Sequence, residues 1–111
     1  MIVYKLVRKM KDGTIKPLFI NKTKPIAVGV WLKAEHHSTK GFSDRSGWHC
    51  GTKPLAPHLS LKGRVWVMCE VTDGSWYTFK RPSNQGGEWI IAEYLKVLCE
   101  LTQEQVDKIN D

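Results

Sequence analysis

The stretch 61-LKGRVWVMCEV-71 carries the pattern that decides the fold. Alternate residues of a strand point to opposite sides of a sheet. Here both sets are largely apolar: Val65, Val67, Cys69 and Val71 on one side, and Arg64, Trp66, Met68 and Glu70 on the other. A strand that is apolar on both sides is covered on both sides. The stretch therefore predicts a central strand of a β-sheet.

The N-terminal segment predicts a hairpin. Residues 2–10 alternate as an amphipathic strand, and Asp12-Gly13 supplies a turn, since glycine takes positive φ at little cost. Residues 15–20 are the expected returning strand. Pro17 places that strand near an edge, because proline cannot donate to a ladder. An edge strand here could pair with a second copy, although nothing in the sequence requires it.

The middle of the chain predicts two more strands. Residues 26–35 are rich in branched and aromatic side chains, and Gly29 in their centre argues against a helix. Residues 48–50 are expected to form a very short strand. Residues 54–59 contain two prolines and fit one helical turn.

The C-terminal third predicts another hairpin and a helix. Asp73-Gly74 is the turn signal before a strand at 75–79. Residues 88–101 are ambiguous: their first half fits a helical turn, and their second half alternates as a strand, which we favour there. Thr102 and Gln105 have capping-box spacing, which predicts a short helix over 102–110. The fold class expected is α+β, a small β-rich domain with a mainly antiparallel sheet.

Chain length, cysteine content and net charge limit the class of protein. A chain of 111 residues fits one domain, 1–111, and no apolar run approaches the ~20 residues that a membrane helix needs. Three cysteines do not form a disulfide framework, so we expect a cytoplasmic protein. The net charge of +6 favours anionic partners. Basic residues crowd the first third, and up to Lys33 only Asp12 stands against them: Lys5, Arg8, Lys9, Lys11, Lys16, Lys22, Lys24 and Lys33.

A glycine- and proline-rich segment, 40-KGFSDRSGWHCGTKPLAPHL-59, is the expected location of a site. Cation, imidazole and indole groups together suit a nucleotide or a nucleic-acid strand. We therefore expect a polar pocket that binds an anionic ligand. Its predicted contacts are Arg45, Trp48, His49, Lys53 and His58, with Trp48 as the stacking surface.

Two other interpretations of this segment are weaker. Histidines 36, 37, 49 and 58 with Cys50 match no zinc-ligand spacing, so no metal or other cofactor is specified. Cys50 could act as a nucleophile with His49 or His58 as its base, but no orienting partner is evident. A small buried cysteine beside a tryptophan explains Cys50 more simply.

Four stretches carry a family resemblance: YKLVRKMKDGTIKPLFIN (4–21), GVWLKAE (29–35), KGFSDRSGWHCGTKPLAPHLSLKGRVWV (40–67) and RPSNQGGEWI (81–90). The chain resembles, over roughly residues 3–100, an uncharacterised family of small proteins encoded by bacteriophages and prophages of gut bacteria. The segment 47–58 is the most distinctive part. The resemblance implies a viral origin and a bacterial cytoplasm, and it assigns no catalytic residue.

Binding, rather than catalysis, is the expected function. The partner would be a nucleotide, a nucleic acid or an acidic host-protein surface. The alternatives are a small enzyme that acts on a nucleotide through His49 or Cys50, and an inhibitor of host defence that acts by protein contact. Affinity that falls steeply with salt would indicate nucleic acid, an exposed apolar patch would indicate a protein partner, and a perturbed pKa in a cleft would indicate an enzyme.

Overall fold

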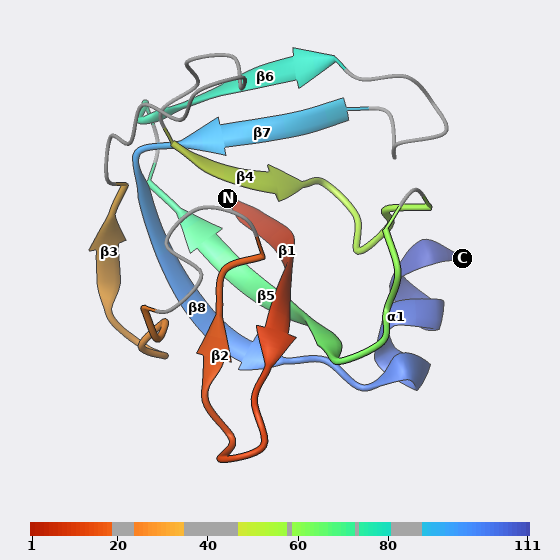
Figure 1. Cartoon of the computed structure of the whole chain (residues 1–111). Coiled ribbons are helices and arrows are strands. Elements are labelled where there is room, and N and C mark those ends of the chain that lie inside the picture. The colour runs from red at the N-terminus through yellow and green to blue at the C-terminus, as the bar shows by residue number, and fades with distance from the viewer. Residues whose placement is uncertain (19–23, 35–46, 58, 73, 81–87) are drawn as a thin grey trace, which may run out of the picture.

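The pairing of β1 (Ile2–Lys9) with β5 (Arg64–Val71) is the centre of the sheet in the computed structural model of the chain (Figure 1). The two antiparallel strands pair from Ile2 opposite Glu70 to Arg8 opposite Arg64. The structure describes residues 1–18, 24–34, 47–57, 59–72, 74–80 and 88–111. The position predicted for the stretch 61–71, inside the sheet and not at its edge, is confirmed.

Within the described residues, eight strands form one sheet whose strand pairs are antiparallel. Its order is β3 (Trp31–Lys33), β8 (Tyr94–Glu100), β5, β1, β4 (Trp48–Gly51), β7 (Glu88–Ala92) and β6 (Trp76–Lys80). β2 (Ile15–Lys16) lies off this path and pairs with the C-terminal end of β1, while β4 meets β1 nearer its start, at Tyr4 opposite Gly51. The side of β1 that does not pair with β5 is thus shared by β2 and β4.

One face of the sheet curls around an inner cluster of apolar side chains. Side chains from β8, β5, β1, β4 and β7 form one continuous cluster, and Figure 1 shows the sheet curving along this order of strands. The members of this inner cluster are Val3, Val7, Ile15, Ile26, Cys50, Val67, Cys69, Val71, Ile90, Ala92, Leu95 and Val97.

The helix α1 (Gln103–Asn110) covers part of the other face. Trp66 of β5 and Val106 of α1 are buried together in a second, helix-side cluster. Asn110 ties the end of the helix to the segment after β4, because its Nδ2 donates to the Pro54 carbonyl at 3.0 Å. β1 and β5 are therefore covered on both faces, and the predicted α+β class with a mainly antiparallel sheet and a short C-terminal helix is confirmed.

Two predicted strands are shorter than expected. The prediction over 26–35 was wrong in length, because only Trp31–Lys33 is strand. Gly29 has a φ of +83°, a left-handed conformation that breaks an extended strand before this point. β2 ends at Lys16, immediately before Pro17, which has no N–H to continue the ladder.

The ambiguous segment 88–101 forms two strands, β7 and β8, and no helical turn. β7 is paired by β4 and by β6, and core covers both of its faces. Trp89 packs in the helix-side cluster and Ile90 and Ala92 pack in the inner cluster, so consecutive residues of β7 are buried. Within the described ranges, no helix has the length and apolar character that crossing a membrane requires.

We expect Thr102→Ala to lower the free energy of unfolding by about 1 kcal/mol. The substitution removes the side-chain oxygen that accepts from the Gln105 N–H at 3.2 Å, and it weakens a capping box completed by Gln105 Oε1. Urea unfolding followed by tryptophan fluorescence measures the change. Thr52→Ala, at an exposed position outside the helix, is the control, and equal midpoints for the two variants would show that the cap contributes nothing.

Candidate functional site

Two glycines frame β4 in the segment predicted to hold a site. A side chain at Gly47 would collide with Ile91 of β7, and the φ of Gly47 is +131°. A Cβ at Gly51 would lie 2.8 Å from the carbonyl oxygen of Lys53, where the chain turns sharply after the strand. Both positions exclude larger residues, so β4 is fixed in place against its neighbours at each end.

Alternation along β4 separates the residues that were predicted to share a pocket. Cys50 belongs to the inner cluster and Trp48 packs against it, so both point to the inner face. His49 lies between them and points to the opposite face, opposite Ile91 in the register with β7. Trp48 and His49 are both half-buried, on opposite faces of β4.

The Trp48 indole is held by contacts at its edge and over its ring. Its Nε1 donates to the Leu32 carbonyl at 3.1 Å, which ties β4 to β3. The Lys5 ammonium lies 5.8 Å from the centroid of the indole, within the range of a cation–π interaction. Lys5 Nζ also donates to the His49 carbonyl at 2.9 Å. The indole is therefore a fixed platform beside a fixed positive charge.

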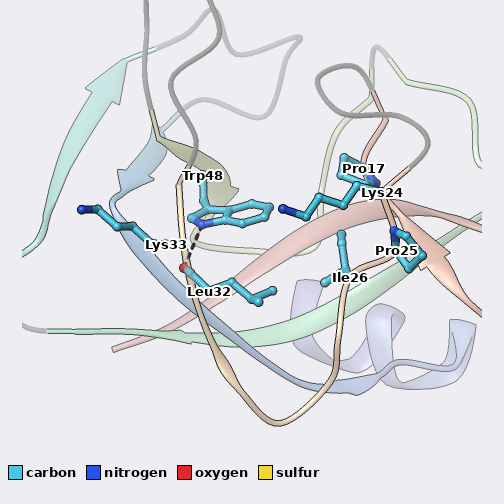
Figure 2. Close-up of a pocket in the computed structure, with 7 residues that line it drawn as sticks. All are labelled: Pro17, Lys24, Pro25, Ile26, Leu32, Lys33 and Trp48. Carbon is cyan, nitrogen blue, oxygen red and sulfur yellow. Dashed lines mark hydrogen bonds between the residues drawn. The ribbon is translucent and has the colours of Figure 1, made fainter.

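A shallow hollow of about 70 Å³ adjoins this platform (Figure 2). Figure 2 shows the Lys24 side chain extending toward the indole, whereas the Lys33 amino group points away from the hollow. Both lysines are exposed. The lining consists of Pro17, Lys24, Pro25, Ile26, Leu32, Lys33 and Trp48. Indole and lysine thus meet here without a histidine among the lining residues.

The other predicted contacts do not join this hollow. Arg45 and His58 lie outside the described residues, so their predicted roles stay predictions. Lys53 is exposed at the turn after β4 and is not among the lining residues. The lysines that contact Trp48 or line the hollow beside it, namely Lys5, Lys24 and Lys33, all belong to the basic first third of the chain. That excess of charge was the sequence signal for them, but it does not indicate which lysines converge.

Burial suppresses the chemistry of the two inner cysteines. Desolvation raises the pKa of the Cys50 thiol to about 11, although the nearby Lys5 charge opposes the shift. Burial likewise raises the pKa of Cys69 to about 12. With a pKa near 11, about one thiol in ten thousand is ionised at neutral pH, so Cys50 is a poor nucleophile. Among the side chains that the structure describes, no three His, Cys, Asp or Glu residues gather as metal ligands would.

We expect iodoacetamide at about pH 8 to modify Cys99 rapidly and to reach Cys50 and Cys69 only when the protein unfolds. Cys99 is exposed on β8, whereas the other two thiols are buried. Mass spectrometry of digested samples measures each rate, and Cys99→Ser should leave no fast-reacting thiol. Rapid modification of Cys50 in the folded protein would contradict the burial and restore the nucleophile hypothesis.

Comparisons with protein-family models, with curated proteins and with solved structures found no match to this chain. The viral origin implied by the resemblance therefore stays a prediction.

Proposed function

We propose that this protein binds single-stranded nucleic acid, with one base stacked on Trp48 and the neighbouring phosphates in contact with lysines. The observation that carries the proposal is the fixed indole, with the Lys5 ammonium over its ring and Lys24 and Lys33 at the adjoining hollow. Aromatic platforms in basic surroundings are the usual means of holding single strands, because every base has a π-face that can stack.

The size of the hollow favours a strand over a free nucleotide. Pockets that enclose small molecules occupy about 300–1,000 Å³. The hollow beside Trp48 measures about 70 Å³, which is too small to enclose a base, a sugar and a phosphate together. A base that lies flat on a partly exposed indole needs no enclosure, and the rest of the strand remains at the surface.

The ion pair of Lys33 leaves its ammonium available to phosphates. Lys33 is 4.0 Å from Glu93, but both side chains are at least half exposed, and ion pairs of this kind contribute little. Net charge of +6 adds a long-range attraction for polyanions that does not depend on sequence. The proposed binding is therefore sensitive to salt and tolerant of base identity.

A protein partner is a second candidate, supported by a different surface. Val28, Val30 and Trp31 lie in or just before the edge strand β3, and all three are about half exposed. Trp31 is covered in part by Lys96, whose ammonium is 5.0 Å from the ring centroid. An exposed apolar edge of this kind suits contact with another protein, as expected for a host-defence inhibitor. Enzyme chemistry through Cys50 has the least support, because the thiol is buried.

We expect Trp48→Leu to weaken binding of a fluorescein-labelled deoxythymidine oligonucleotide about 5- to 150-fold, which corresponds to about 1–3 kcal/mol of stacking. Trp48→Phe, which keeps an aromatic face, should retain most of the affinity. Replacing Lys24 and Lys33 together by alanine should lower the slope of log affinity against log salt by up to about 1.4, or about 0.7 for each lost phosphate contact. Fluorescence anisotropy between about 50 and 200 mM NaCl measures both effects.

Trp31→Leu and Lys108→Ala are the matched controls. The first removes an exposed indole on the edge strand, and the second removes an exposed lysine on the helix. Thermal unfolding checks that each variant is folded. If Trp48→Leu and Trp31→Leu had equal effects on oligonucleotide binding, Trp48 would not be the stacking residue.

A further inference from the structure

Three cationic side chains stand side by side at the end of the central strands. Arg8 of β1 lies directly opposite Lys16 of β2 on one side and directly opposite Arg64 of β5 on the other. Directly opposed residues have Cβ atoms only ~5 Å apart. We call these three residues the cation row.

The cation row lies on the helix-side face of the sheet. Tyr4 and Leu6 precede Arg8 at alternate positions of β1, and both pack in the helix-side cluster. On β5, Trp66 is two positions from Arg64, so it points to the same face, and it too packs in the helix-side cluster. All three members of the row are half-buried, so solvent screens their charges less than those of fully exposed side chains.

This arrangement opposes folding. Like charges placed directly opposite one another in a sheet are destabilising. Other lysines do have carboxylate partners: Lys9 with Glu100, Lys33 with Glu93, Lys96 with Glu70 and Lys108 with Glu104. In the part of the chain that the structure describes, Lys16 and Arg64 form no ion pair. The Lys16 charge helps to lower the pKa of Asp12, but Asp12 Oδ1 accepts hydrogen bonds from the N–H and the hydroxyl of Thr14.

Backbone carbonyls orient both guanidinium groups. Arg8 Nε donates to the Pro17 carbonyl at 3.2 Å, and Arg64 Nη1 donates to the Ser60 carbonyl at 3.0 Å. A guanidinium has five N–H donors in a rigid fork, so the bond to Ser60 leaves other donors of Arg64 for a ligand. Arg64 also lines a hollow of about 210 Å³ between β5 and the start of α1, beside Gln103. Fixed guanidinium groups are suited to phosphate oxygens.

We propose that the cation row binds phosphate groups of the same nucleic-acid strand whose base stacks on Trp48. The Trp48 hollow and the cation row meet at Lys16 and Pro17. Pro17 lines the Trp48 hollow, its carbonyl holds Arg8, and the preceding residue Lys16 is part of the row. A strand that crosses the sheet edge at Lys16 and Pro17 meets both sites. This inference rests on the proposed function and adds the path that the nucleic-acid strand takes over the protein surface.

Lys16→Gln combined with Arg64→Gln tests the inference. Two lost phosphate contacts should lower the salt slope of deoxythymidine oligonucleotide binding by about 1.4 and the affinity at about 0.1 M salt roughly 25-fold. The same variant should unfold at the wild-type temperature or above it, because like-charge repulsion is relieved. Arg64→Lys, which keeps the charge and loses the fork, should retain the slope. Sodium pyrophosphate should raise the unfolding temperature of the wild type and not of the double variant.

Lys9→Gln is the matched control, since Lys9 is next to Arg8 in sequence but points to the other face, where it pairs with Glu100. Wild-type affinity and slope in the double variant would overturn the inference. If Trp48→Leu still weakened binding in that case, the proposed function would stand without the cation row. If the wild type bound no oligonucleotide, the proposed function would fail, and the assignment of the row to a strand would fail with it.

Discussion

Burial of β1 and β5 on both faces is the constraint on which the rest of the structure depends. A strand with core on both sides has few positions for a charged residue, because a buried charge without a partner is costly. Lys5 lies between Val3 and Val7 on the inner face of β1, and both valines are fully buried. Its ammonium must therefore find polar partners at the margin of the core. It does so at the His49 carbonyl and the Trp48 ring.

The same constraint locates Arg8 and Arg64. They pair with each other at the end of the β1–β5 ladder, and their side chains point to the helix-side face. Lys5 and the cation row are thus consequences of one alternating pattern, expressed on two faces of the same strands. Strand alternation permits this division of charge, but it does not require three cations in register. That register is the feature that folding alone does not explain.

Much of the fold could be predicted because its signals are local. Alternation in 61–71 identifies a central strand, and the spacing of Thr102 and Gln105 marks the start of the helix. Gly29 shows where local reasoning failed. Its absence of a side chain was recognised as unfavourable to a helix, but only the backbone shows that φ is positive there and that the strand begins two residues later.

The site was harder to predict because its members converge through long-range contacts. Trp48 was identified from its segment, whereas its partner Lys5 lies 43 positions earlier and reaches it only because β4 pairs beside β1. His49 was grouped with Trp48 because the two are adjacent in sequence. In a strand, adjacency has the opposite effect, since neighbours point to opposite faces. The excess of basic residues in the first third indicated the right partners as a class but not as individuals.

The most direct measurement of the central claim is a nuclear magnetic resonance titration of the labelled protein with a deoxythymidine oligonucleotide. The indole N–H of Trp48, which donates to Leu32, gives a resonance of its own. A strand stacked on Trp48 shifts that resonance together with the backbone signals of Lys5 and Lys24, and it leaves the indole N–H of Trp31 unchanged. A shift at Trp31 without one at Trp48 would place the contact on the edge strand and contradict the account.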